Sequence, residues 1–168
     1  MWPRGPSSPF PVVSFVEQGV AAMSSSQLKE STGSTTDLAH RYLDAAWNRM
    51  DLSALDELAR TDLYVYYPLM PEATTDRESF KQTLQAIRAG MPDLHFDLRH
   101  VATHGDTAVF SWQASGEHSG DLLGLAPTGR SVQWTGLSVI EMSDGRVAKE
   151  WGEEDALGLF RQLGAVPD

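Results

Sequence analysis

The chain has no cysteine among its 168 residues. Disulfides, thiolate nucleophiles and cysteine-based metal sites are therefore excluded together, and any chemistry must rest on carboxylates, imidazoles or hydroxyls. Basic residues are scarce, because 13 Lys and Arg stand against 23 Asp and Glu, a formal net charge of −10. Nucleic-acid binding needs a clustered basic face, so the composition predicts no nucleic-acid partner.

Long hydrophobic runs are also absent. No stretch approaches the roughly 18 apolar residues that cross a bilayer. The mainly apolar run at residues 11–16 ends at Glu17 and is too short for a secretory signal peptide. We therefore expect a soluble, cytoplasmic protein with no membrane partner. Met23 could equally be the native start of the chain.

The motifs of metal and cofactor chemistry are missing as well. The five histidines include no His-x-His and no i, i+4 pair on a predicted helix, so we expect no metal. No Gly-rich phosphate loop joins a strand to a helix, and Gly-x-Ser-x-Gly does not occur. The sequence thus predicts neither a cofactor nor a nucleophilic serine.

What is present divides into a tail and one domain. Residues 1–35 are rich in Pro, Ser and Gly and have little hydrophobic periodicity, so we expect a disordered tail. Residues 36–168 suffice for one well-buried domain and are too few for two comfortable ones.

The first half of this domain has helical spacing. Apolar residues at 39, 43, 46 and 50 form one stripe, and those at 52, 55 and 58 indicate a second, short helix. The aromatic run from Leu63 to Tyr67 ends at Pro68 and indicates a strand. Thr75 and Glu78 predict a capping box, with Thr75 as the N-cap of a helix that ends around Gly90.

Beyond Pro92 the hydrophobic period falls to two. This pattern predicts strands at about 94–101, 107–115, 131–142 and 146–151, with turns at 104–106 and 144–145. Helices followed by an antiparallel sheet favour an α+β fold over an alternating parallel one. Helices resting on one face of a curved sheet would enclose a conical cavity.

Two motifs frame the last strands. Residues 116–130 set glycines, a proline and polar groups between two strands, and a loop of this kind usually rims a pocket. At the chain's end, residues 151–155 (WGEED) lead into a short apolar helix that closes with residues 162–164 (QLG). With the Pro-Thr-Gly-Arg step at 127–130, this order resembles the SnoaL-like polyketide cyclase (ester cyclase) family, within the NTF2-like fold.

The chain departs from the family pattern in two places. Glu117 stands where Thr is usual, and Tyr66 and Tyr67 precede Pro68 where the family often carries His or Asp. The resemblance implies an NTF2-like cone, with N-terminal helices packed on a curved antiparallel sheet around a pocket. It also implies a cofactor-free enzyme that closes a ring in a polyketide ester by an aldol-type reaction.

Asp155 and His118 are the candidate catalytic residues. Asp155 follows Trp151 at the end of the last strand, where apolar neighbours would leave its carboxylate poorly solvated and suited to acid/base catalysis. It could equally be only the N-cap of the closing helix. His118 lies in the glycine-rich loop, where it could bond a substrate carbonyl or shuttle a proton, or be an ordinary surface histidine.

Large aromatic side chains are the candidate substrate-binding residues. They could line a site for an apolar or aromatic small molecule, although each could also be core filler. They are Trp112, Trp134, Trp151, Tyr66 and Tyr67.

Other functions stay open at this point, because relatives on one fold perform different reactions. The alternatives are an isomerase, a dehydratase or an epoxide hydrolase on the same scaffold, and a non-enzymatic module that binds a small ligand or dimerises. We expect a homodimer, as the resemblance implies and because Leu137 and Val139 would need cover if they point outward from the sheet.

Overall fold

The computed structural model describes residues 35–70, 72–122 and 124–166. The predicted tail therefore lies outside the described residues, apart from Thr35. The helix at residues 35–43 runs on into a π-helical turn, η1. The elements are η1 (Asp44–Arg49), α2 (Ala54–Leu58), β1 (Ala59–Tyr66), α3 (Arg77–Gly90), β2 (His95–His104), β3 (Thr107–Glu117), β4 (Ser131–Ser143), β5 (Arg146–Glu154) and α4 (Ala156–Leu163).

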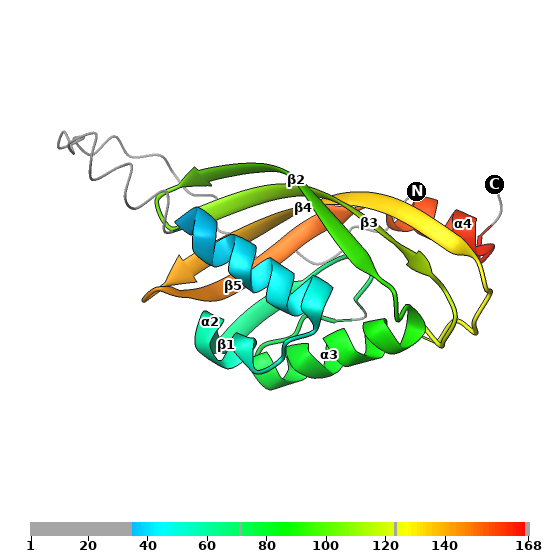
Figure 1. Ribbon diagram of the computed structural model, residues 1–168, viewed down its shortest axis with the longest axis horizontal. Helices are drawn as coiled ribbons and strands as arrows, with labels where there is room; N and C mark the ends of the chain where they lie inside the picture. The colour runs from blue at the N-terminus through cyan, green and yellow to red at the C-terminus, as the bar shows by residue number, and fades with distance from the viewer. Residues whose placement is uncertain (1–34, 71, 123, 167–168) are drawn as a thin grey trace, which may run out of the picture.

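The five strands form one curled sheet in the order β1-β5-β4-β3-β2 (Figure 1). Neighbouring strands are antiparallel except for β1 and β5, which pair in parallel. Burial alternates along the strands, most clearly on β3, where Ala108, Phe110, Trp112 and Ala114 are buried. The period of two in the sequence therefore reflects an inner and an outer face, and the predicted α+β fold is confirmed.

Helices cover the inner face of the sheet. The helical stretch from residue 35 through η1 crosses it, and α3 lies further round the same side (Figure 1). Tyr42 and Leu43 are buried here, as are Ala45, Ala46 and Trp47 of η1. A π-helical turn is a rare device that often occurs at functional sites. Here it carries Trp47 inward, where it contacts the rings of Tyr67 and Phe96.

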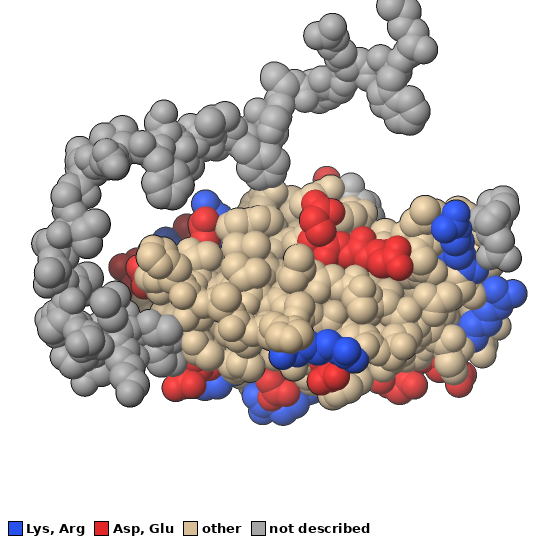
Figure 2. All heavy atoms as spheres, turned by 90° about the horizontal axis from the view of Figure 1, so that it is seen from above, with Lys and Arg blue, Asp and Glu red and all other residues tan. Residues whose placement is uncertain are grey.

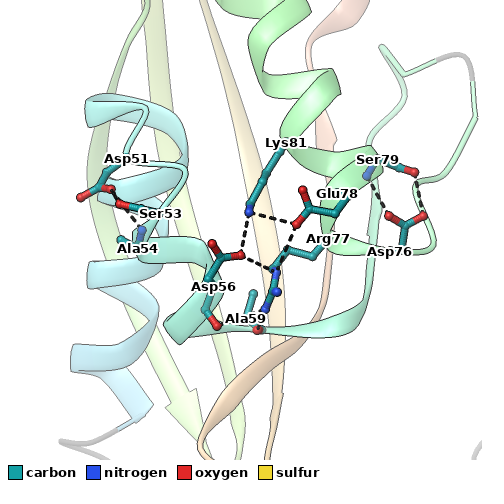
Figure 3. A network of polar contacts seen from close by, with 10 residues as sticks. All are labelled: Asp51, Ser53, Ala54, Asp56, Ala59, Asp76, Arg77, Glu78, Ser79 and Lys81. Atoms are coloured by element: carbon teal, nitrogen blue, oxygen red, sulfur yellow. Dashed lines mark hydrogen bonds and ion pairs between the residues drawn. The ribbon is translucent and has the colours of Figure 1, made fainter.

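The start of α3 differs from the sequence prediction. Its N-cap is Asp76 rather than Thr75, because the Asp76 carboxylate accepts hydrogen bonds from the backbone N–H of Ser79 at 2.8 Å and from the Ser79 hydroxyl at 2.7 Å. Figure 3 shows this cap. Both residues are good N-caps, and the helix begins one residue later than predicted. Glu78 is not part of a capping box and instead forms an ion pair with Lys81 at 2.9 Å.

The same end of α3 is tied to α2. Asp56 lies within 2.6 Å of the Lys81 ammonium and within 3.1 Å of Arg77 (Figure 3). Arg77 also donates hydrogen bonds to the backbone carbonyls of Asp56 and Ala59. These contacts fix the short helix α2 and the start of β1 against α3, the helix that closes one side of the cone.

The outer face of the sheet carries apolar side chains. Tyr66, Trp151, Val139 and Val109 lie opposite one another on β1, β5, β4 and β3 and form a continuous cross-strand row. Leu137, beside this row, is 51% exposed. Figure 2, seen from the side away from α3, shows a broad area free of charged side chains. Within the described residues, no helix is both long and apolar enough to cross a membrane.

Candidate functional site

The inside of the cone holds a cavity of about 60 Å³. Side chains from the helices, the strands and the loops between them form its wall. Its lining is Trp47, Tyr67, Leu69, Met70, Ile87, Met91, Leu94, Phe96, Trp112, Leu122, Trp134, Glu154, Leu159 and Phe160. Leu122 comes from the glycine-rich loop, so that loop does rim the cavity.

One side of the cavity is a cluster of aromatic rings. Phe96 lies between Trp47 and Trp112, with ring centres 5.1 and 5.0 Å away, and Trp134 packs edge-on to Trp112 at 6.5 Å. Edge-to-face rings at these separations form stable, well-oriented contacts. The wall is therefore rigid, apolar and suited to a flat or hydrophobic ligand.

Two strand glycines make room for this wall. A Cβ atom on Gly136 would lie 2.3 Å from the Trp112 ring, and one on Gly152 would lie 2.5 Å from the Tyr67 ring. Any other residue at either position would clash, because real Cβ contacts are not that short. A glycine inside a strand often marks such a close approach, and here each one lets an aromatic side chain lie flat across the sheet.

Glu154 is the only ionisable carboxylate in the lining of this cavity among the described residues. Its Oε2 accepts a hydrogen bond from the indole N–H of Trp134 at 3.1 Å, and its Oε1 accepts one from the backbone N–H of Leu69 at 3.2 Å. Burial raises the pKa of Glu154 above the ordinary glutamate value, while these two hydrogen bonds oppose the rise. The carboxylate is thus oriented, poorly solvated and open to a ligand.

A second polar group lies deeper, beneath the aromatic wall. Glu150 on β5 is fully buried and accepts hydrogen bonds from the hydroxyls of Tyr42 and Tyr67, both at 2.6 Å, and from the indole N–H of Trp47 at 3.1 Å. The Tyr67 hydroxyl also lies 2.5 Å from the hydroxyl of Ser138. Burial raises the pKa of Glu150. Tyr67 and Trp47 belong both to this network and to the cavity wall.

A small inner cavity of about 10 Å³ adjoins the network. It shares four walls with the larger cavity, namely Trp47, Tyr67, Phe96 and Trp112. Ser138 and Asn48 add polar groups to its lining. A space of this size holds about one water molecule or one oxygen atom of a ligand.

Asp155 lies outside both cavities. It is exposed, and its carboxylate accepts a hydrogen bond from the backbone N–H of Gly158 at 2.9 Å, which makes it the N-cap of α4. The geometry therefore favours the capping interpretation of this residue. The carboxylate that points into the cavity belongs to its neighbour, Glu154.

His118 is buried but does not line the cavity. Its Nδ1 lies 3.1 Å from the Thr128 hydroxyl, and its backbone exchanges hydrogen bonds with Arg130 and Gly129. Within the described residues, its Nε2 has no hydrogen-bond partner. These contacts hold the two ends of the glycine-rich loop together, and the structure does not bring His118 near Glu154.

The five predicted aromatic residues divide between the two faces of the sheet. Trp112, Trp134 and Tyr67 line the cavity. Tyr66 and Trp151 lie opposite each other on the outer face, and Tyr66 is 41% exposed. Their position follows from strand alternation, because their neighbours Tyr67 and Glu150 point inward.

Sequence reasoning missed Trp47, Phe96, Glu150 and Glu154. A signal for the two glutamates was present in the motif itself. Residues 150, 152 and 154 share one face of a strand, and the glycine at 152 marks that face as the crowded one. The prediction instead placed Trp151 at the ligand site together with the other large aromatic residues.

The fold and the cavity within it define an NTF2-like cone of the kind that polyketide cyclases have. A family model for SnoaL-like polyketide cyclase matches residues 37–163, and the chain belongs to this family. No match to the chain was found among curated proteins.

Solved structures agree with this assignment. A protein from Jannaschia sp. CCS1, described as a SnoaL-like polyketide cyclase, is 20% identical over 82% of this chain and 96% of its own, with a TM-score of 0.74. IdmH, described as a polyketide cyclase from Streptomyces antibioticus, is 28% identical over 77% and 98%, with a TM-score of 0.66. AclR, described as a hydroxylase from Streptomyces galilaeus, is 25% identical over 82% and 85%, with a TM-score of 0.70. The names show that similar proteins have been given different activities.

Proposed function

We propose that the chain is a cofactor-free, polyketide cyclase-like enzyme that transfers protons on a carbonyl compound and closes a ring by an aldol-type reaction. The observation that carries the proposal is the carboxylate of Glu154 in an otherwise apolar and aromatic cavity. A poorly solvated carboxylate with a raised pKa is a stronger base near neutral pH than an exposed one. We assign the role of base to Glu154 in place of Asp155.

In this proposal Glu154 removes a proton from a carbon next to a carbonyl group. The resulting enolate carbon attacks a second carbonyl of the same molecule, which forms the carbon–carbon bond. The protonated Glu154 then returns its proton to the new alkoxide. The product is therefore an isomer of the substrate, and the carboxylate is regenerated without a second reactant. Trp134 and the Leu69 N–H hold the carboxylate in place, and the aromatic wall keeps the flexible substrate folded.

The size of the cavity restricts the ligand. About 60 Å³ is room for roughly four waters, which is comparable with one small aromatic ring. The cavity supports an apolar or aromatic substrate, and within the described residues its lining has no arginine.

A non-enzymatic ligand-binding module is the second candidate. The observation that favours it is that Asp155, the base predicted from the sequence, is an exposed cap outside the pocket, so the enzyme proposal depends on Glu154 alone. Both candidates bind a small apolar molecule. They differ in whether a proton is removed from it.

Acetophenone separates the two candidates, because it has one aromatic ring and a methyl group whose hydrogens are next to a carbonyl. Proton NMR in D₂O would follow the loss of the methyl signal with and without the protein. The enzyme proposal predicts exchange faster than in buffer of the same pH. Binding of acetophenone without faster exchange would overturn the enzyme proposal and favour the binding module.

A further inference from the structure

Glu150 is a buried carboxyl that the proposed proton transfer does not use. It is fully buried, and within the described residues it forms no ion pair with Lys, Arg or His. Its partners are Tyr42, Tyr67 and Trp47, all of which are neutral donors. A buried charge without a counter-charge is costly, so the carboxyl holds a proton more readily than an ordinary glutamate does.

That proton changes the number of hydrogen-bond donors in the network around Glu150. With Glu150 ionised, the indole N–H of Trp112 donates to Ser138, the Ser138 hydroxyl donates to Tyr67, and the Tyr67 hydroxyl donates to Glu150. Every hydrogen of this chain is then used inside the network. If Glu150 is protonated and donates to the Tyr67 oxygen, one extra hydrogen becomes available at the hydroxyls of Tyr67 and Ser138.

Those two hydroxyl-bearing residues both line the inner cavity of about 10 Å³. That cavity adjoins the larger one and holds about one oxygen atom. A carbonyl oxygen placed there would gain negative charge as its neighbouring carbon loses a proton. A positioned hydrogen-bond donor at such an oxygen stabilises the transition state.

We propose that the inner cavity is a binding subsite for one carbonyl oxygen of the substrate, and that Glu150 is a positioning residue whose proton frees one hydroxyl of the Tyr67–Ser138 pair to donate a hydrogen bond to this oxygen. The inference rests on the proposed function, since it takes a carbonyl compound as the ligand. Glu154 removes the proton from carbon, and the hydrogen supplied through Glu150 is shared with oxygen. When the enolate collapses, the hydrogen returns along Tyr67 to Glu150.

The substitution Glu150→Gln tests this subsite. The indole N–H of Trp47 can only donate, so the new amide must place its oxygen toward Trp47 and Tyr67, which share one carboxylate oxygen in the parent. Tyr67 then still donates into the network, and no extra hydrogen reaches the inner cavity. The matched control is Tyr42→Phe, which removes a bond to the other carboxylate oxygen and leaves both cavity linings intact.

Two probes of the same shape give the readout. Acetophenone has a carbonyl oxygen, and α-methylstyrene has a CH₂ group in its place. We expect the parent and Tyr42→Phe to bind acetophenone about tenfold more tightly than α-methylstyrene, the size of one hydrogen bond of about 1.4 kcal/mol. The infrared carbonyl band of bound acetophenone should lie at lower frequency than in an apolar solvent. Glu150→Gln should lose both the preference and the band shift while still binding α-methylstyrene.

A structural role for Glu150 alone would weaken both probes equally, and that result would overturn the inference. An unshifted carbonyl band in the parent protein would also overturn it, whether or not the Glu150→Gln variant folds. If the parent protein does not speed up methyl exchange over buffer but the carbonyl band of bound acetophenone is still shifted, the proposed reaction is contradicted and the subsite is supported. If the parent binds neither probe, the proposed function and the subsite both fail.

Discussion

Gly152 shows how much a single residue decides at this site. It lies on β5 between Glu150 and Glu154, and the Tyr67 ring packs against it on the inner face of the sheet. A Cβ atom here would come within 2.1 Å of the Leu137 carbonyl oxygen as well as 2.5 Å of the Tyr67 ring. The backbone oxygen cannot move without breaking the β4–β5 pairing, so the clash has to displace Tyr67 or the strand.

We therefore expect Gly152→Ala to destabilise the fold by about 1–3 kcal/mol, the usual effect of overpacking a core. Urea unfolding measures this change in the free energy of unfolding. Glu153→Ala is the matched control, because Glu153 is exposed on the opposite face of the strand and its removal should change stability by less than about 0.5 kcal/mol. Equal stability of the two variants would show that the close approach at Gly152 does not exist in solution.

Of the five aromatic residues predicted to bind substrate, three line the cavity and two lie on the outer face of the sheet, and their role in binding stays a prediction. Trp112, Trp134 and Tyr67 could be identified as wall residues because large aromatics are rarely left exposed. The predicted catalytic carboxylate, Asp155, caps α4, whereas the carboxylate that lines the cavity belongs to Glu154, one position earlier. A shift of one residue in a strand exchanges the two faces, and neither Trp151 nor the acidic run identifies the inward face without the partner strands.

At the scale of elements, α3 depends on its N-terminal cap. The pKa of Asp76 is lowered, first by the Ser79 hydroxyl and then by the Ser79 backbone N–H. A carboxyl whose folded pKa lies below its unfolded value stabilises the fold above the unfolded pKa, and this stability is lost as the pH falls through the folded pKa. The charge of Asp76 should thus help α3 at neutral pH and cease to help in acid.

Asp76→Asn isolates this effect, because asparagine caps helices about as well as aspartate but cannot be ionised. We expect the variant to melt at a lower temperature than the parent at pH 7, and the difference to shrink as the pH falls below the ordinary aspartate range near 4. Thermal melting followed by circular dichroism across this pH range is the measurement. A difference that stays constant with pH would contradict the role of the charge.

Most elements could be predicted from periodicity, but their pairing could not. The strands after Pro92 follow a clear period of two, and the turns at 104–106 and 144–145 are where the sequence places them. The parallel pairing of β1 with β5 has no local signal, because it joins segments about 85 residues apart through contacts such as Tyr66 with Trp151. The helical spacing of the sequence likewise predicted an ordinary helix over η1 and not a π-helical turn.

At the scale of the whole molecule, the outer face of the sheet is an apolar surface with exposed side chains. The row of Tyr66, Trp151, Val139 and Val109 spans four strands. Contiguous apolar surface of this kind often marks an interface, and a symmetric dimer is the commonest way to cover it. We propose that two copies associate through this face.

Val139→Asp places a charge in the middle of the row, and we expect it to convert a dimer into a monomer. Thr135→Asp, four residues along the same face of β4, is the matched control and should leave the dimer intact. Light scattering at micromolar concentration gives the mass. A monomeric parent protein would remove the proposal.

Proton removal by Glu154 is the central claim, and one comparison tests it most directly. Exchange of the acetophenone methyl hydrogens in D₂O is measured for the parent, for Glu154→Gln and for Asp155→Asn, with melting temperatures to confirm that each is folded. The amide in Glu154→Gln keeps the shape but cannot accept a proton, so we expect exchange to fall by about 10²–10⁴-fold. Asp155→Asn should exchange like the parent, because asparagine keeps the cap of α4. Exchange that survives in Glu154→Gln and is lost in Asp155→Asn would contradict the account.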